Sequence, residues 1–116
     1  MAMRILAASE NLSMVDSYNL TRNPETERMS NHVGETLAVE RYMVREEERP
    51  DTGEVITIVS INDGTTTYST NSPTFVREFM AILEMAKNAG AAIHHIKVAS
   101  GTSKRGREYN TCVFID

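Results

Sequence analysis

The sequence of 116 residues predicts a mainly β fold with one long helix. Apolar and polar side chains alternate over residues 36–46, and β-branched residues dominate residues 54–61. Both patterns are typical of strands. Over residues 73–89 the apolar side chains recur at helical spacing instead. Extended character returns after that helix, so the predicted order is three strands, a helix and two strands.

Turn residues separate the first three strands. Pro50, Asp51 and Gly53 favour a turn after the first strand, because they preset or tolerate the backbone angles that turns need. The sequence Asn-Asp-Gly at residues 62–64 is a strong hairpin signal. It leads into a third strand at residues 65–70, whose hydroxyl-rich composition indicates at least one exposed face.

End signals define the helix, and two strands follow it. Ser72 is a good N-cap residue and Pro73 suits the first helical position. Gly90 suits the residue at which a helix ends. We expect the last two strands at residues 92–100 and 107–115, joined by a glycine-containing turn.

The N-terminal part has no clean periodicity. Residues 1–34 are expected to form a loop-rich extension, with a short strand around residues 3–6 and a short helix near residues 12–20. Residues 35–116 would form the body of a single domain, since a chain of this length has room for one core.

This order of elements matches the five-stranded Greek-key barrel that binds oligonucleotides and oligosaccharides, in which a helix lies between the third and fourth strands. Two hairpin loops flank the ligand face of such a barrel, and here they would be residues 46–53 and 101–106. An open antiparallel sheet covered by one helix uses the same strands and is the alternative.

Composition limits the class of protein. The hydrophobic content of 41% and the charged content of 24% fit an ordinary globular domain. No apolar run of about 18 residues is present, so we expect no transmembrane helix. The one cysteine, Cys112, lies in an apolar strand, which indicates a buried thiol in a reducing cytoplasm.

The net charge of -4 argues against a generally basic nucleic-acid binder, but the distribution of charge qualifies that objection. Residues 1–91 carry eight basic and fourteen acidic side chains, whereas residues 92–116 carry four basic and two acidic ones. Because salt screens charges beyond about 10 Å, a local basic strip can attract phosphate even on an acidic molecule.

The basic strip is the predicted hairpin "GTSKRGRE". Lys104 and Arg105 at its tip could contact phosphates, while Arg107 and Tyr109 would stand at the base of the last strand, where a nucleic-acid base could stack. A nucleotide-binding phosphate loop requires a following helix, and a strand follows here. The alternatives are an ordinary solvated hairpin and, because Tyr109 shares a strand face with apolar residues, a buried tyrosine.

A second candidate surface lies on the first predicted strand. Arg41, Arg45 and Arg49 supply cations, and Tyr42 supplies a ring. Strand alternation places Arg41 and Arg45 on one face and Tyr42 on the other. The acidic run at residues 46–48 would repel phosphate, so a solvated strand end with mixed ion pairs is the alternative.

We expect neither a metal site nor a catalytic site. His94 and His95 are neighbours on a strand and would point to opposite faces. One cysteine and a distant His32 do not give a zinc spacing. No catalytic triad or metal-binding carboxylate cluster can be inferred, so the sequence predicts a protein that is not an enzyme and holds no cofactor.

Two segments in the second half of the chain, "YSTNSPTFVREF" and "IHHIKVASGTSKRGREYNTC", share a pattern with a known family. They resemble the small single-stranded DNA-binding proteins of bacteriophages. The matching positions are Tyr68, Thr70, Ser72, Phe75, Gly101, Ser103, Lys104, Gly106, Arg107 and Tyr109. The resemblance implies a barrel of the type described above, acting on single strands in phage replication or recombination. Many relatives end in an acidic recruiting tail, which is not expected here.

Sequence-independent binding of single-stranded DNA is therefore the main hypothesis, with replication or recombination proteins as further partners and strand edges that could pair two copies. The expected contacts are the cations Arg41, Arg45, Arg49, Lys97, Lys104, Arg105 and Arg107 and the rings Tyr42, Tyr68 and Tyr109. Tyr68 could equally be a half-buried sheet tyrosine. The alternative is a protein-interaction module without a nucleic-acid partner, which would use Glu46, Glu47, Glu48, Asp51 and Glu54.

Overall fold

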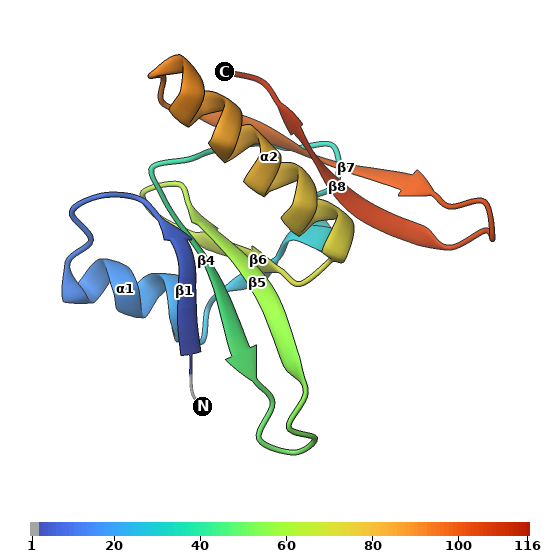
Figure 1. The fold of residues 1–116 in the computed structure, drawn as a ribbon, viewed down its shortest axis with the longest axis horizontal. Coiled ribbons are helices and arrows are strands. Elements are labelled where there is room, and N and C mark those ends of the chain that lie inside the picture. The colour runs from blue at the N-terminus through green and yellow to red at the C-terminus, as the bar shows by residue number, and fades with distance from the viewer. Residues whose placement is uncertain (1–2) are drawn as a thin grey trace.

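Two β-sheets and two helices build the protein in a computed structural model that describes residues 3–116 (Figure 1). The strands are β1 (Met3–Ala8), β2 (Glu27–Arg28), β3 (Thr36–Ala38), β4 (Arg41–Glu48), β5 (Val55–Asn62), β6 (Thr67–Thr70), β7 (His95–Thr102) and β8 (Glu108–Phe114). The helices are α1 (Met14–Thr21) and α2 (Pro73–Ala89), and a 3₁₀ turn, η1 (Met29–His32), follows β2. The predicted order of three strands, a helix and two strands is confirmed.

The first predicted strand is divided between the two sheets. One sheet has the order β1-β4-β5-β6-β2, and the other has the order β3-β7-β8. The chain leaves the second sheet at β3 and enters the first at β4 after only two residues. Hydrogen-bonded pairing therefore runs from β6 through β5 to β4, and then from β3 through β7 to β8.

The predicted closed five-stranded barrel is wrong. Closing it would require β6 to pair with β8, and no such pairing is present within residues 3–116. The reason is that β6 has neighbours on both edges, β5 on one side and the parallel strand β2 on the other. The N-terminal segment therefore occupies the edge that the last strand would need.

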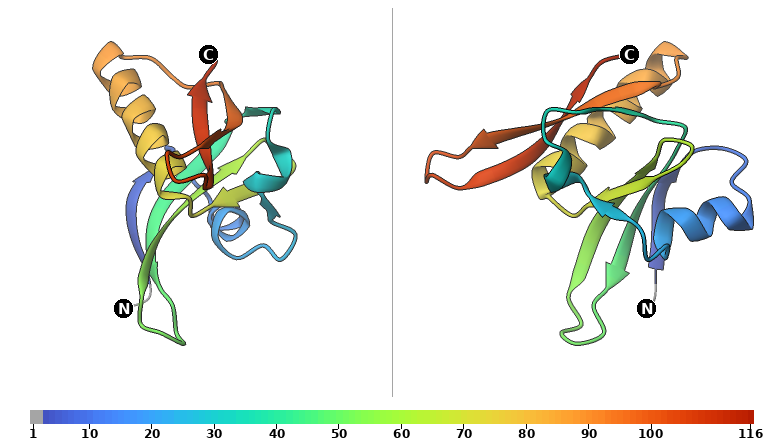
Figure 2. Two further views of the ribbon diagram at one scale, coloured as in Figure 1. Left: turned by 90° about the vertical axis from the view of Figure 1, so that its right-hand side faces the viewer. Right: turned by 180° about the vertical axis from the view of Figure 1, so that it is seen from behind.

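The N-terminal segment is built into the fold, and its predicted short strand and helix are both present. β1 pairs antiparallel with β4, with an irregularity between Ile5 and Ala7. Helix α1 begins in a capping box, in which Ser13 and Asp16 each accept a hydrogen bond from the other's backbone amide. Its buried residue Leu20 accepts a hydrogen bond from Arg45 of β4, and α1 lies on the opposite side of the first sheet from α2 (Figure 2).

Helix α2 supplies the centre of the core. The helix has the bounds that the sequence predicts, and Gly90 ends it in a left-handed conformation at φ 64°. Phe75 and Phe79 are fully buried with their rings 6.3 Å apart. The core residues packed around them include Met29, Leu37, Val44, Val59, Ile61, Ile96, Val98 and Cys112. The two sheets are thus joined through one cluster beneath α2.

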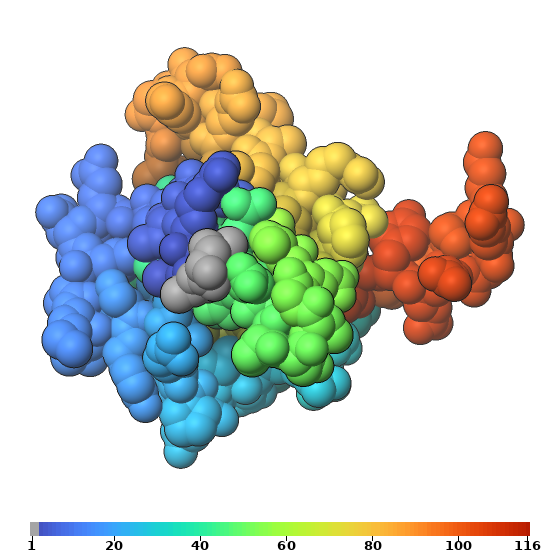
Figure 3. Space-filling model, turned by 60° about the horizontal axis from the view of Figure 1, so that its bottom comes forward, coloured from blue at the N-terminus to red at the C-terminus, as the bar shows by residue number. Residues whose placement is uncertain are grey.

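Two hairpins leave this core in different directions. The β4–β5 hairpin turns near residues 49–54, and the β7–β8 hairpin turns near residues 103–107. The β7–β8 hairpin extends well beyond the rest of the surface in the other views (Figures 2 and 3). In the part of the chain that the structure describes, no helix has the length and apolar character needed to cross a membrane.

Candidate nucleic-acid interface

The tip of the β7–β8 hairpin presents three cations. The Ser103 amide donates to the Arg107 carbonyl at 2.8 Å, and the Gly106 amide donates to the Ser103 carbonyl at 2.9 Å. Gly106 has a φ of 80°, which glycine adopts without strain. Lys104, Arg105 and Arg107 are exposed, and none of them forms an ion pair with any residue in the described chain. The turn therefore holds three cations that are free to meet a phosphate.

The Tyr109 ring lies against a glycine of the neighbouring strand. Gly101 and Tyr109 are cross-strand partners, and a Cβ atom at Gly101 would lie 2.5 Å from the Tyr109 Cζ atom. The ring is 37% exposed, while Cys112 on the opposite face of β8 is 5% exposed. Tyr109 is therefore not a core residue, and the glycine provides the space in which its ring rests.

The outer face of this hairpin also carries Lys97, four residues before Gly101 on β7. Lys97 pairs with Val113, four register steps from the Gly101–Tyr109 pair, so strand alternation places both pairs on one face. Lys97 is exposed and has no ion-pair partner among residues 3–116. The hairpin thus carries Tyr109 and Lys97 on its outer face and Lys104, Arg105 and Arg107 near its tip.

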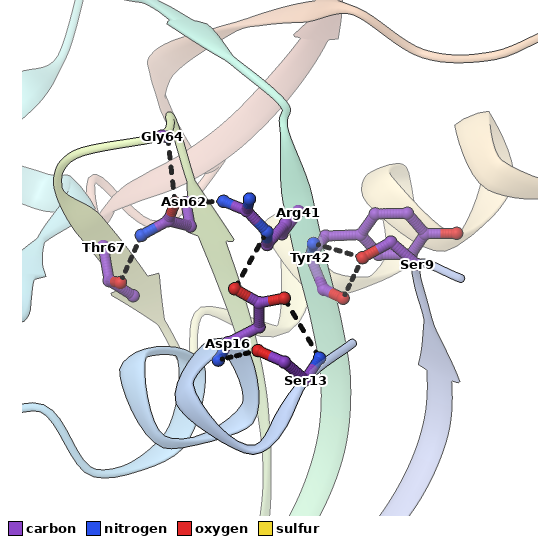
Figure 4. A network of polar contacts seen from close by, with 8 residues as sticks. All are labelled: Ser9, Ser13, Asp16, Arg41, Tyr42, Asn62, Gly64 and Thr67. Carbon is purple, nitrogen blue, oxygen red and sulfur yellow. Dashed lines mark hydrogen bonds and ion pairs between the residues drawn. The ribbon is translucent and has the colours of Figure 1, made fainter. Parts of the chain in front are cut away.

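Arg41 belongs to a network that joins α1 to the first sheet (Figure 4). Its Nε atom lies 3.1 Å from the Asp16 Oδ1 atom, and its Nη1 atom donates to Asn62 Oδ1 at 3.4 Å. The backbone hydrogen bond from Ser13 lowers the pKa of Asp16, and Arg41 lowers it further against the opposing effect of desolvation. The main role of Arg41 in this structure is therefore to hold α1 in place.

Arg45 is buried, contrary to the expectation of a solvent-facing cation. Its side chain is 4% exposed, and its Nη1 atom donates to the Leu20 carbonyl at 3.2 Å and to Ser60 Oγ at 2.9 Å. Its Nε atom donates to Glu47 Oε1 at 3.0 Å. Alternation identified the correct face, but α1 covers that face. A nucleic acid cannot reach this guanidinium.

Tyr42 is a packing residue rather than a free stacking platform. It packs edge-to-face on Phe79 with ring centroids 5.6 Å apart, and it lies against the core. Burial raises the pKa of its hydroxyl, with Glu10 adding to the effect. Arg49, by contrast, is exposed at the β4–β5 turn, where its amide donates to the Glu54 carbonyl at 2.8 Å.

Tyr68 belongs to a cluster that fixes the β2–η1 segment. Its ring meets His32 edge-on at 4.8 Å, and its hydroxyl donates to Asp63 Oδ2 at 3.4 Å. His32 lies between two carboxylates, 2.6 Å from Glu27 Oε1 and 2.9 Å from Glu35 Oε2. Desolvation lowers the pKa of His32, but the two hydrogen bonds outweigh desolvation and raise the pKa above its usual value. Tyr68 is therefore a half-buried sheet tyrosine, which was the alternative to a stacking residue.

A polar concavity lies between the two hairpins. Its volume is about 440 Å³, within the range of small-molecule sites. The residues that line it are Arg28, Ser30, Ile56, Ile58, Ser69, Thr70, Asn71, Ser72 and Asn110. Arg28 is the one charged side chain in this described lining, and no carboxylate is present there. The concavity offers hydroxyl and amide groups around a cation.

The sequence did not predict this concavity. Its residues come from β2, η1, β5, β6, the entry to α2, and β8, and no short motif joins them. Alternation along β8 also places Asn110 and Tyr109 on opposite faces. A ligand that used both would have to pass around the edge of the hairpin. One sequence feature did point to the concavity: the hydroxyl-rich third strand at residues 65–70 was expected to have at least one exposed face.

No metal or nucleophile site is found in the described chain, where no three metal-ligating side chains gather. Burial, together with nearby Glu78, raises the pKa of the Cys112 thiol to about 12. The expectation that His94 and His95 point apart is wrong: each Nδ1 atom lies 3.7 Å from an oxygen of Asp116. Strand alternation does not apply to this pair because His94 precedes β7.

Comparison with known proteins gives no relative: no protein-family model, no curated protein and no solved structure matches the chain.

Proposed function

We propose that this protein binds single-stranded DNA without sequence preference and is not an enzyme. The observation that carries the proposal is the projecting β7–β8 hairpin, which carries unpaired cations and an exposed phenol ring. Cations that follow the backbone together with rings on which bases stack are the two parts of a sequence-tolerant single-strand site. Each stacked base contributes roughly 1–3 kcal/mol.

The arrangement of strands supports the same proposal. The pairing order β6-β5-β4 and β3-β7-β8 is that of the oligonucleotide-binding barrel, opened at the one seam where β2 takes the edge of β6. In this proposal the two hairpins and the concavity would take the places of the loops and the ligand face of such a barrel. We therefore infer an open variant of that fold with an added N-terminal strand.

Two acidic side chains near the proposed path, Glu46 and Glu47, are each paired with an arginine. Glu46 lies 3.4 Å from the Arg4 Nε atom, and Glu47 accepts from Arg45 at 3.0 Å. Such pairing reduces the repulsion that the acidic run at residues 46–48 would exert on a phosphate backbone. A strand could then follow the outer face of β7–β8, pass around its edge and enter the concavity, with Arg49 near the other hairpin tip.

The test is anisotropy of a labelled oligo-dT at two salt concentrations. We expect micromolar or tighter binding, with log K falling by about 0.7 per phosphate neutralised for each unit of log salt. The double variant Lys104→Glu with Arg105→Glu should bind at least ten-fold more weakly. Arg77→Glu with Lys87→Glu makes the same charge change on α2 and should have a much smaller effect. Absence of binding by the wild type at low salt would sink the proposal.

The resemblance to bacteriophage proteins extends the proposal to a setting. The protein would protect or organise single strands during phage replication or recombination, in the cytoplasm of the host cell. The competing function is an acidic interaction module, and it is favoured by exposed Asp51 and Glu54 on the β4–β5 hairpin. Charge reversal at those two residues should leave oligo-dT binding intact or strengthen it if the DNA-binding proposal holds.

A further inference from the structure

The concavity between the two hairpins exists because β6 is shorter than β5. The last residue of β6, Thr70, pairs with Val59, whereas β5 reaches from there back to Val55. Within the described chain, residues 55–58 of β5 therefore have a partner strand only on the side of β4. The space that a longer β6 would occupy is left open, and the chain turns beside it into α2.

The first sheet gives the concavity an apolar surface. Ile56 and Ile58 line it and lie on one face of β5, because they are two residues apart. Both are only half-buried, so their side chains remain open to a ligand. Ser60 lies on this face as well, and the cross-strand pairs Ser60–Ser69 and Ser69–Arg28 extend it through β6 to β2. The face thus has aliphatic side chains on β5 and a cation on β2.

Two carboxamides without partners also line the concavity. Asn71 follows β6, and Asn110 lies on β8 in the second sheet. In the described chain neither of these side chains forms a hydrogen bond, whereas the carboxamides of Asn19, Asn23 and Asn62 all do. The fold therefore makes no use of the two carboxamides that face the concavity.

Backbone contacts hold both asparagines in place. The Ser72 hydroxyl donates to the Asn110 carbonyl at 3.0 Å, which ties β8 to the residue after Asn71. The Ser72 amide donates to Thr70 Oγ1 at 3.1 Å, which fixes the turn between β6 and α2. The chain around the two carboxamides is thus positioned by contacts of its own, while their donors and acceptors stay open.

The lining fits a planar ligand with a polar edge. A carboxamide offers two N–H donors and one carbonyl acceptor, which complements the mixed donors and acceptors on the edge of a nucleobase. Aliphatic side chains suit the face of a base. Arg28 is the one charged side chain in the described lining, so the ligand gains little from a high charge. The volume of about 440 Å³ lies in the lower part of the range for small-molecule sites, which suits one nucleotide.

We propose that the concavity is a nucleobase subsite. One base of the bound strand rests with its face on Ile56 and Ile58. The carboxamides of Asn71 and Asn110 form hydrogen bonds with its edge. The strand as the source of this base rests on the proposed function, whereas the preference for a base comes from the lining. The protein would thus hold one base by its edge, and Tyr109 would hold another by its face.

Removing the carboxamides tests the subsite. Asn71→Ala and Asn110→Ala should each weaken oligo-dT binding about five-fold in anisotropy titrations, as expected for one lost hydrogen bond. The salt slope should stay unchanged, because neither substitution removes a charge. The matched control, Asn88→Ala, removes an exposed carboxamide from α2 outside the concavity and should bind like the wild type. All three variants should unfold at the urea concentration of the wild type, since none of these carboxamides has a partner in the described chain.

A strand without bases separates the base contact from all others. An abasic oligonucleotide of the same length keeps the sugars and phosphates, so Asn71→Ala and Asn110→Ala should bind it as tightly as the wild type does. If they lose as much affinity for the abasic strand as for oligo-dT, the asparagines contact the backbone and the nucleobase subsite is overturned. If they bind oligo-dT like Asn88→Ala, the subsite is overturned as well, and the single-strand proposal rests on the hairpin.

NMR of the wild-type protein tests the subsite without any substitution. Thymidine at millimolar concentration should shift the side-chain carboxamide resonances of Asn71 and Asn110, whereas 2-deoxyribose 5-phosphate, which has no base, should not. A shift by the sugar phosphate alone would contradict the subsite. If thymidine shifts these resonances but oligo-dT does not bind, the subsite stands and the proposed function fails. If oligo-dT binds and neither it nor thymidine moves them, only the subsite fails.

Discussion

Replacing Arg45 by methionine should show that this arginine is a structural residue. Its side chain is 4% exposed and donates hydrogen bonds to the Leu20 carbonyl, the Ser60 hydroxyl and the Glu47 carboxylate. Methionine retains an unbranched apolar stem of similar length. The substitution therefore removes the charge and the donors while it fills much of the same space.

The size of the stability loss follows from the hydrogen-bond acceptors that Arg45→Met would leave without a donor. Ser60 is fully buried, and the Leu20 carbonyl belongs to a buried residue in the last turn of α1, so both acceptors lose their partner without gaining water. Each buried polar group left unsatisfied costs about 1–3 kcal/mol. Glu47 has a side chain that is 31% exposed, so water can replace the lost ion pair. We expect the free energy of unfolding to fall by about 3 kcal/mol in total.

Urea denaturation followed by circular dichroism measures this loss. With an m-value of about 1.5 kcal/mol/M, the midpoint should fall by about 2 M. The control is Arg49→Met on the exposed β4–β5 turn, which should change stability by less than about 0.5 kcal/mol. The reasoning would be refuted if Arg45→Met cost less than about 1 kcal/mol or if the folded variant lost oligo-dT affinity at full stability.

Three further outcomes are expected. Gly101→Ala should displace the Tyr109 ring, since the new Cβ atom would lie 2.5 Å from it; oligo-dT binding should weaken up to ten-fold, measured by anisotropy, with stability changed by less than about 1 kcal/mol. Because the pKa of His32 is raised, its protonated form stabilises the fold. The free energy of unfolding should therefore be greatest below pH 6.5, the usual pKa of histidine, and should decrease as the pH rises through the folded-state pKa. His32→Gln should remove this pH dependence in urea titrations from pH 5 to 8. With its pKa raised to about 12, Cys112 should resist iodoacetamide at pH 8 in the native protein and react at once in urea.

The helix and most strands were predictable because their signals are local. Ser72-Pro73, the run of apolar residues at helical spacing and Gly90 all agree, and the helix has the predicted bounds. Closure of the barrel depends instead on which strand reaches the free edge of β6. The strand that does so, β2, is two residues long, and a segment of that length has no periodicity to detect.

The residues of the candidate site likewise differ in whether local signals or distant segments decide their positions. The hairpin cations were predictable because charged residues between two glycines at a turn have nowhere to be buried. Strand alternation reports the face on which Arg45 lies, but not the distant segment that covers this face. For Tyr109, alternation alone suggested a possible core position, and the structure shows that a glycine across the strand pair gives its ring a place on the surface. In both cases a partner distant in sequence decides the role.

The excess of acidic residues is compatible with an anionic ligand because of where the partners of those residues lie. Arg4, Arg41 and Arg45 are paired to carboxylates around the first sheet, and His32 is held by two more. In these pairs, basic and acidic side chains in the body of the protein neutralise one another. The cations without partners in the described chain include all three at the β7–β8 tip and the one that lines the concavity. Because screening limits each charge to its own neighbourhood, the proposed attraction of a phosphate backbone depends on this local excess and not on the net charge of -4.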